Sequence, residues 1–180
     1  MVVNLGVNCI LYATNDGNRN MANSLKGWAI WIVVIVIASS IFSSCTSADR
    51  DNSGEVVDSG SVSAFEIKVG DCLTDTFGAG DSTFSETNAV PCNEPHAFEA
   101  YHSEYLSGDN FPADINTLAD DICYYAFPDF VGVTVEETDL SYSSLLPTQN
   151  SWDQKSDREV TCLVGMYDGS EVTGTLRNSR

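Results

Sequence analysis

Four cysteines constrain the fold of this chain more than any other feature of its sequence: Cys72, Cys92, Cys123 and Cys162. All four follow an apolar run from Trp28 to Phe42, which is a candidate export or membrane segment. Exported chains reach compartments where disulfides form, and an even number of cysteines favours complete pairing. The sequence therefore predicts a small domain outside the cytoplasm that is stabilised by two disulfides.

Four cysteines allow three pairings. Cys72 and Cys92 flank a glycine-rich loop and are the closest pair in sequence, while Cys123 falls in a predicted helix that can reach Cys162 on a strand beneath it. We therefore expect the pairs Cys72–Cys92 and Cys123–Cys162. A zinc site is the alternative, but the close CxxC-type spacing that it needs is absent.

The apolar run allows two kinds of membrane attachment. It follows Lys26, precedes small polar residues and is shorter than the roughly 20 residues that span a bilayer, as in a secretory signal. Its end, "FSSC", resembles the lipobox of bacterial lipoproteins apart from Phe42, so we expect lipid attachment at Cys45. A single-pass anchor helix is the alternative. Either attachment leaves the rest of the chain at the cell membrane, facing outside the cytoplasm.

The chain divides into four predicted parts. Residues 1–20 lack apolar periodicity, and Met21 opens a signal of ordinary proportions, so 1–20 is predicted to be a mis-annotated extension. Residues 21–45 form the signal or membrane segment. Residues 46–60 are rich in Ser, Asp, Asn and Gly and are predicted to be a flexible tether. Residues 61–180 form one extracytoplasmic domain of ordinary size.

The net charge limits the possible partners. The chain has 26 acidic and 8 basic residues, a net charge of −18, and every acid except Asp16 follows Cys45. Such a surface repels phosphate backbones. We therefore expect no nucleic-acid partner, and we expect contact with the membrane through the lipid or the apolar anchor.

Hydrophobic periodicity predicts an α+β fold. Apolar residues at three- and four-residue steps, including Ile115, Leu118 and Ile122, predict one main helix that starts near Pro112 and is ended by Pro128. Alternating or strand-like patterns predict strands at 62–69, 88–92, 97–102, 140–147, 159–167 and 171–176. "DGSE" predicts a hairpin between the last two. The expected fold is a small antiparallel sheet with the helix packed on it.

The stretch "PCNEPHAFEAYHSEYL", residues 91–106, concentrates potential metal ligands. On a strand, His96 and His102 lie about 20 Å apart, and Glu99 points to the opposite face. These side chains do not converge. We therefore expect no metal site here and expect His96 to form a local hydrogen bond where the strand begins.

No catalytic motif stands out elsewhere in the chain. It lacks the G-x-S-x-G and S-x-x-K nucleophile motifs and has only 2 histidines. We therefore expect a non-catalytic binding module without a cofactor. The alternative is a cell-wall hydrolase that uses an acidic residue pair, since the domain holds many carboxylates and no spacing singles out two of them.

Aromatic residues are the candidates for partner contact, because amphipathic rings are favoured at interfaces and at core margins alike. The candidate residues are Tyr101, Tyr105, Trp152 and Arg158, and a sheet edge near Val90 is a further possibility. For Trp152 and Arg158 a structural role is favoured. In that role Trp152 covers the edge of the core, and Arg158 pairs with Asp153 or Asp157.

The ordered motifs "VGDCL", "VPCNEPHAFEAY", "C..AF..FVG", "P....W....DREVTCLV" and "VTGTLRNS" resemble the septum-formation domain of actinobacterial envelope proteins, over Val69 to Ser179. The resemblance implies a membrane-tethered, disulfide-bonded module linked to cell division, without an established enzymatic activity. An envelope or divisome protein, or a cell-wall glycan, is then the expected partner. The chain departs from the family pattern at Ser156 and Asn178, where the family has glycine, so we expect altered turns there.

Overall fold

The structure is a computed structural model, and it describes residues 47–75 and 85–179. The predicted extension at 1–20, the segment at 21–45 and the lipid site at Cys45 lie outside the described residues. Within the described part, no helix is long and apolar enough to cross a membrane.

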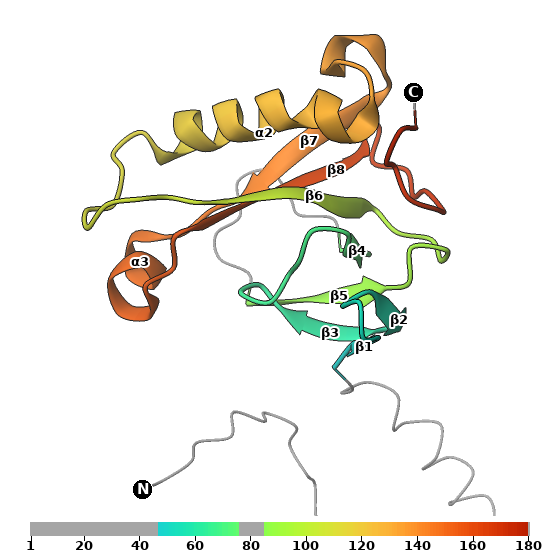
Figure 1. Ribbon diagram of the computed structural model, residues 1–180, viewed down its shortest axis with the longest axis horizontal. Coiled ribbons are helices and arrows are strands. Elements are labelled where there is room, and N and C mark those ends of the chain that lie inside the picture. Colours follow the sequence, from blue (N-terminus) through green and yellow to red (C-terminus); the bar gives the residue numbers. More distant parts are fainter. Residues whose placement is uncertain (1–46, 76–84, 180) are drawn as a thin grey trace, which may run out of the picture. The chain divides into compact units, whose positions relative to one another are not determined.

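A six-stranded antiparallel sheet forms the centre of the domain, with the strand order β3-β5-β4-β6-β8-β7 (Figure 1). Together with the helix described next, it confirms the predicted α+β class. Because β5 lies between β3 and β4, the predicted sheet edge near Val90 is wrong. The strands are β3 (Gly60–Ser63), β4 (Cys72–Leu73), β5 (Glu86–Val90), β6 (Phe98–Tyr105), β7 (Leu140–Leu145) and β8 (Glu159–Met166).

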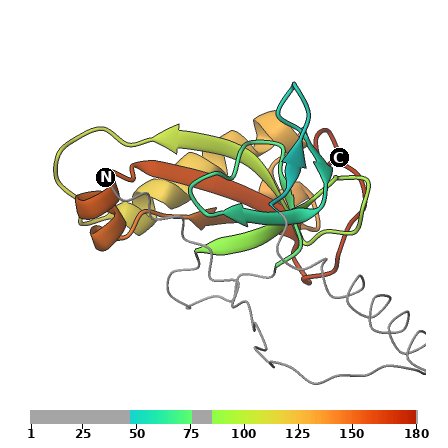
Figure 2. The same cartoon turned by 90° about the horizontal axis from the view of Figure 1, so that it is seen from below.

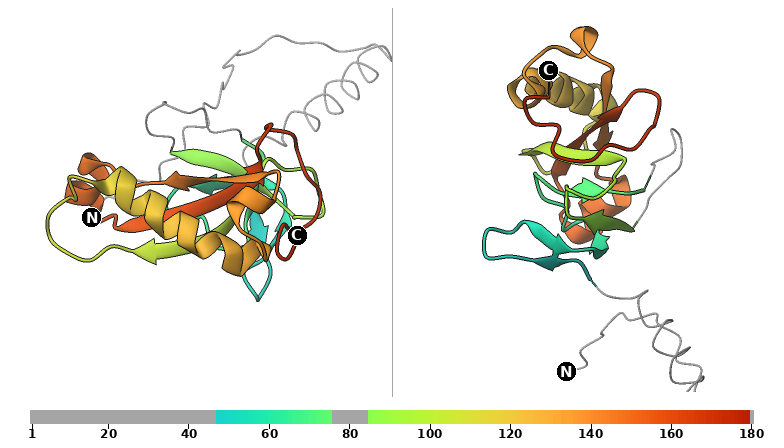
Figure 3. Two further views of the ribbon diagram at one scale, coloured as in Figure 1. Left: turned by 90° about the horizontal axis from the view of Figure 1, so that it is seen from above. Right: turned by 90° about the vertical axis from the view of Figure 1, so that its right-hand side faces the viewer.

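The predicted main helix, α2 (Ile115–Val131), packs on one face of the sheet, across β6, β8 and β7 (Figure 3). Its buried residues recur every three or four positions, so they form one apolar stripe along the helix. They meet buried residues of β6 and β8, including Tyr101, Val160 and Val164, in the larger of two apolar clusters. We call this cluster the helix-side core.

Both ends of α2 differ from the prediction. The helix begins at Ile115 rather than near Pro112, and Pro128 lies inside it. Pro128 removes only one backbone N–H donor, and the helix continues until Gly132 adopts a left-handed conformation (φ 93°) and donates its N–H to the Pro128 carbonyl. Glycine, rather than proline, therefore ends the helix.

The opposite face of the sheet is covered by the segment predicted to be a tether. Residues 49–58 form a hairpin of β1 (Asp49–Arg50) and β2 (Val56–Asp58), so this prediction is wrong over the described part. Val56 is buried with Ile67, Leu73 and Leu163 in a second cluster, the hairpin-side core. The segment is polar, but packing against these distant apolar residues orders it.

Two shorter helices follow α2: the 3-10 helix η1 (Val135–Glu137) and α3 (Gln149–Lys155). The sequence analysis did not predict α3. It begins where the Thr148 hydroxyl accepts a hydrogen bond from the Ser151 amide (3.0 Å). The N-terminal hairpin and α3 lie at opposite ends of the domain (Figure 2).

The last predicted strand and its hairpin are wrong. In residues 171–176 only Val172 forms a bridge, and its partner is His96 rather than a residue of β8. The predicted strand at 62–69 is also shorter, because β3 ends at Ser63 and the following residues turn away. Each segment contributes one buried apolar side chain, Leu176 and Ile67 respectively, without joining the ladder.

Both predicted disulfides are confirmed. Cys72–Cys92 joins β4 to the turn after β5, with Cα atoms 5.2 Å apart. Cys123–Cys162 joins α2 to β8, with Cα atoms 5.4 Å apart, inside the helix-side core. The second bridge thus ties the helix directly to the strand beneath it.

Candidate functional site

The histidine at the start of β6 has a structural role. His96 is fully buried, its Nδ1 lies 2.8 Å from the Glu94 carbonyl oxygen, and its backbone pairs with Val172 in both directions (3.0 and 2.9 Å). The predicted local hydrogen bond is confirmed. The other histidine, His102, lies farther along β6 and is half-exposed, 3.9 Å from Glu104.

Glu99 is the second structural residue of this stretch. Its side chain is only 2% exposed, and its two oxygens accept from the Thr175 hydroxyl (2.7 Å) and the Leu176 amide (2.6 Å). Nearby, the Cys92 carbonyl accepts from the Gly174 amide (2.6 Å). Residues 92–99 therefore hold residues 172–176 in place, and we call this arrangement the C-terminal clasp.

Replacing Glu99 with glutamine should lower the free energy of unfolding by about 1–2 kcal/mol, because a neutral amide replaces the carboxylate that accepts two charge-assisted hydrogen bonds in a buried site. Chemical denaturation measures this loss, and limited proteolysis should show earlier cleavage near Leu176. Glu86→Gln, an exposed change on β5, is the control and should leave both unchanged. Equal behaviour of the two variants would contradict the clasp.

The same corner contains a potential three-ligand set for a metal ion. One ligand atom each from Cys72, Cys92 and Glu99 lies within 4.8 Å of the others. However, the two sulfurs are bonded to each other, whereas a metal needs thiolates, and both Glu99 oxygens already accept hydrogen bonds. The disulfide-bonded form therefore does not fit a metal.

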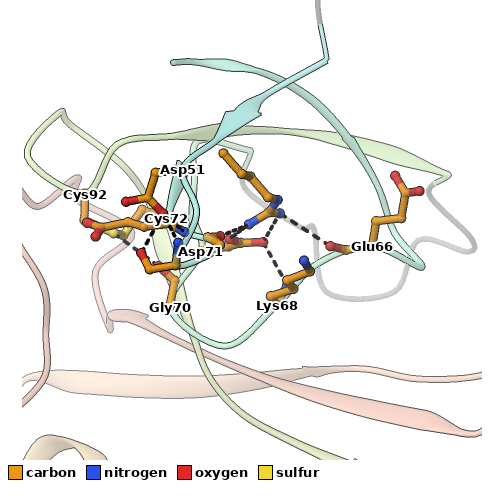
Figure 4. Close-up of polar contacts among 11 residues, drawn as sticks. Asp51, Glu66, Lys68, Gly70, Asp71, Cys72 and Cys92 are labelled. Atoms are coloured by element: carbon orange, nitrogen blue, oxygen red, sulfur yellow. Dashed lines mark hydrogen bonds and ion pairs between the residues drawn. A yellow bond between two sulfur atoms is a disulfide. The ribbon is translucent and has the colours of Figure 1, made fainter. Parts of the chain in front are cut away.

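A buried ion pair ties the N-terminal hairpin to this corner (Figure 4). The guanidinium of Arg50 makes two contacts with the Asp71 carboxylate, at 2.5 and 2.7 Å, and the Lys68 amide donates to the same carboxylate (2.8 Å). Asp71 is 2% exposed. The hydrogen bonds to Asp71 raise the pKa of Arg50.

Beside the pair lies an open hollow of about 570 Å³, whose lining includes Lys68, Asp71, Glu99 and Arg177. Its two buried carboxylates, Asp71 and Glu99, are both occupied by internal donors. Their oxygens hold the fold together, which leaves few free acceptors for a ligand.

The predicted partner-binding residues do not form one surface. Tyr101 is 4% exposed and donates its hydroxyl hydrogen to the Cys123 carbonyl, so it belongs to the helix-side core. Trp152 is 1% exposed, whereas Tyr105, at the end of β6, is 71% exposed. Partner contact through Tyr101 or Trp152 is therefore wrong, and only Tyr105 is freely accessible.

Arg158 acts within the fold. Its guanidinium lies over the Trp152 ring, 3.7 Å from the centroid, and donates to the carbonyl oxygens of Trp152 (2.8 Å) and Asp157 (3.0 Å). The expected structural role of Trp152 is confirmed, whereas the expected pairing of Arg158 with an aspartate side chain is wrong. The partners of Arg158 are backbone oxygens, however, and not the carboxylates of Asp153 or Asp157.

An exposed group of aromatic residues, which was not predicted from the sequence, lies on α2 and β7. The Tyr124 ring contacts those of Tyr125 and Tyr142, with centroids 5.4 and 6.3 Å apart, and Tyr125 is 72% exposed. We call these three residues the tyrosine patch. The signal was present in the sequence, because the helical period that buries Cys123 and Phe127 turns residues 124 and 125 outward.

Acidic partners orient two of these tyrosines. Tyr124 donates to Glu136 (3.1 Å) and Tyr142 donates to Asp120 (2.8 Å). Burial and the bond to Asp120 raise the pKa of Tyr142 to about 12, and the bond to Glu136 raises that of Tyr124. Both hydroxyls therefore remain protonated donors at neutral pH.

A groove of about 370 Å³ lies beside the patch, at the start of β7. Its lining contains five consecutive residues, 138–142, together with Val135 and Tyr167. Residues 140–142 are the first three of β7, and the other lining residues come from η1, from the turn before β7 and from just after the end of β8, so the groove lies at the start of β7. We call it the β7 groove.

Comparison with known families identifies the group to which the chain is related. A family model described as septum formation matches residues 69–179, which is more than half of the chain. The chain belongs to the septum formation family. No curated protein and no solved structure matches it.

The matched part of this septum formation protein contains both disulfides, the C-terminal clasp, the tyrosine patch and the β7 groove. The N-terminal hairpin lies outside the match. Arg50 therefore joins a segment outside the septum formation match to Asp71 inside it. Residues 47–68 are also joined to the matched part by the pairing of β3 with β5 and by the hairpin-side core.

Proposed function

We propose that this septum formation protein is a non-catalytic recognition module that acts outside the cytoplasm, held at the membrane through Cys45 or its apolar segment. Membership of the family indicates a role in cell division. The partner is an envelope or divisome protein that binds to the tyrosine patch.

The observation that carries this proposal is the exposure of the tyrosine patch beside the β7 groove. Tyr125 is 72% exposed although one edge of its ring contacts Tyr124, and Tyr167, which lines the groove, is 83% exposed. Tyrosine is enriched in protein interfaces because its ring supplies contact area and its hydroxyl supplies a directed hydrogen bond. Two such rings next to a groove suit protein binding.

The hydrolase alternative receives less support from the described residues. Glycoside hydrolysis needs two carboxylates facing a substrate cleft, one of which is kept protonated. The buried acids Asp71 and Glu99 instead accept hydrogen bonds from the fold. Where acids show a clear shift in pKa, as for Asp51, Glu136 and Asp168, hydrogen bonds lower it, which is opposite to the requirement for a general acid.

Photo-crosslinking in cells tests the proposal. With a photoreactive phenylalanine analogue at Tyr125, the full chain should form a specific adduct with an envelope protein, and a fluorescent fusion should concentrate at the septum. The same analogue at Val57, an exposed position on β2, is the matched control and should give no such adduct.

Two results would overturn the proposal. One is the absence of an adduct from position 125 together with uniform distribution of the fusion around the cell. The other is turnover of peptidoglycan by the purified chain that disappears when one carboxylate is changed to its amide.

A further inference from the structure

Strand β7 has one open edge. The Tyr167 amide donates to the Asp139 carbonyl (2.9 Å), and the register Leu140↔Met166 continues without a shift to Leu145↔Thr161. Because hydrogen-bonded pairs alternate in an antiparallel ladder, residues 141, 143 and 145 bond to β8. The N–H and C=O groups of Tyr142 and Ser144 then point outward, away from the sheet.

The outward groups have no partner among the described residues. The Leu140 amide, which also points outward, reaches the Thr138 hydroxyl at 3.3 Å. At the opposite edge of the sheet, the Ala48 amide donates to the Ser61 carbonyl (3.0 Å), so the incoming chain covers β3. The edge of β7 is therefore the less protected of the two.

Natural sheets usually protect such an edge with proline, charged side chains or a β-bulge. The sequence of β7, "LSYSSL", contains neither proline nor a charged residue, and its pairing with β8 has no bulge. An unprotected edge that begins at a groove is suited to strand addition.

We propose that β7 binds an extended peptide segment that carries Lys or Arg side chains and belongs to another protein outside the cytoplasm, and that this segment pairs with β7 as an added strand. This inference rests on the proposed function and specifies its binding mode. The backbone groups of Tyr142 and Ser144 hold the main chain of the peptide, and the β7 groove takes its side chains.

Charge selects a basic peptide as the occupant. Asp139 lines the groove, Glu136 and Glu137 follow its lining residue Val135 in η1, and Asp120 accepts a hydrogen bond from Tyr142. None of the five described cations, Arg50, Lys68, Lys155, Arg158 and Arg177, lines it. A second copy of this chain would bring the same acids against one another, which is unfavourable. Lysine or arginine can instead pair with these acids and contact the tyrosine rings.

Binding of a defined probe to the full chain in detergent tests the proposal. The probe is a fluorescein-labelled peptide of alternating lysine and threonine, measured by fluorescence anisotropy. Hydrogen exchange followed by mass spectrometry should show slower exchange over 140–145 when the probe is bound. A probe with N-methyl groups on alternate residues, which cannot donate along one edge, should bind about tenfold more weakly.

A proline substitution tests the edge from the protein side. Ser144→Pro removes an outward N–H that β8 does not use, so the ladder is kept. It should weaken binding about tenfold, while Ser144→Ala, which keeps the N–H, should bind as the unaltered chain does.

Neutralisation of charge tests the choice of occupant. Glu136→Gln with Asp139→Asn should weaken binding about fivefold, whereas Glu55→Gln with Asp58→Asn, an equal charge loss on the N-terminal hairpin, should not. An acidic probe with glutamate in place of lysine should not bind.

Several results would overturn the proposal. These are equal binding of the N-methylated probe, unchanged probe binding by Ser144→Pro, and slowed exchange elsewhere but not at 140–145. A concentration-dependent dimer that Ser144→Pro abolishes would also overturn it, because it would show that a second copy of the chain pairs with β7.

The cellular adduct from position 125 separates the two proposals. If it forms equally in a Ser144→Pro background, edge pairing fails while the proposed function stands; if it is lost there but kept in Ser144→Ala, edge pairing is supported.

Discussion

Replacing both Cys123 and Cys162 with alanine should lower the free energy of unfolding by about 4 kcal/mol and the melting temperature by about 10–20 °C. The bridge closes a loop of 39 residues, and its removal gives the unfolded chain more conformational freedom. Both cysteines are also fully buried in the helix-side core, so α2 loses its covalent attachment to β8. Calorimetry and urea denaturation measure the loss.

Removal of the other bridge provides the comparison. Cys72→Ala with Cys92→Ala opens a loop of only 20 residues, and Cys92 is half-buried, so the expected loss is smaller, about 3 kcal/mol. If the two double variants melt at the same temperature as the unaltered chain, the bridges do not stabilise the domain. A larger loss from the shorter loop would show that packing around Cys72 outweighs loop length.

Replacing Arg50 with methionine should lower the free energy of unfolding by about 3 kcal/mol, because it leaves the Asp71 carboxylate buried without its countercharge. The side chain of Arg50 is itself 18% exposed, so water can partly replace it, which places the cost at the lower end for buried pairs. Hydrogen exchange should show that residues 47–58 become less protected first, since this pair holds the hairpin against Asp71.

A double-mutant cycle isolates the interaction. Asp71→Asn added to Arg50→Met should recover part of the loss, because the buried charge is then gone. Lys155→Met, which removes an exposed cation that lies over the Phe65 ring, is the control and should change stability by less than about 1 kcal/mol. A cycle in which the two losses simply add would mean that Arg50 and Asp71 stabilise the fold independently.

The sheet, the main helix and both disulfides could be predicted because hydrophobic periodicity locates the strands and the helix, and the number and positions of the cysteines then indicate the pairs. Alternating apolar residues mark β6 and β8, three- and four-residue steps mark α2, and the cysteine pairs follow from placing these elements. The strand register and the ends of the helix were harder to predict from the sequence, because they depend on backbone conformations such as that of Gly132.

The N-terminal hairpin could not be predicted from its composition. Residues 46–60 contain little apolar surface, so their order depends on partners far along the chain. Val56 packs against Leu163, and Arg50 pairs with Asp71. Local sequence propensity does not indicate contacts between residues that are far apart in the chain.

The candidate site was only partly predictable for the same reason. Tyr101 and Tyr105 lie on one strand, yet a register shift between Ala100 and His102 accompanies the burial of the first, while the second is exposed at the strand end. Trp152 is buried because α3 places it against Phe111, and α3 was not predicted. The tyrosine patch joins two elements whose alignment requires the folded structure.

The family comparison of turn residues, by contrast, was informative. Ser156 and Asn178 stand where the resemblance implies glycine, and they are the only non-glycine residues in the described part with a positive φ, 56° at each. Glycine adopts this conformation without steric cost, whereas other residues are strained there. Both residues therefore adopt a backbone conformation that suits glycine, at a steric cost that is larger for Ser156 than for Asn178, since asparagine tolerates it better.

The position of β8 has a consequence for how the chain acquires its structure during translation. β8 is the last strand to be synthesised, but it lies between β6 and β7 and provides half of the disulfide that fastens α2. Nascent β6 and β7 have no strand between them to pair with until Glu159–Met166 emerges, and Leu176 completes the same core still later. Because long-range pairing must wait for the final residues, the polypeptide should lack stable tertiary structure while it is being synthesised. A chain that is threaded through a membrane channel must remain unfolded until its C-terminal end has passed.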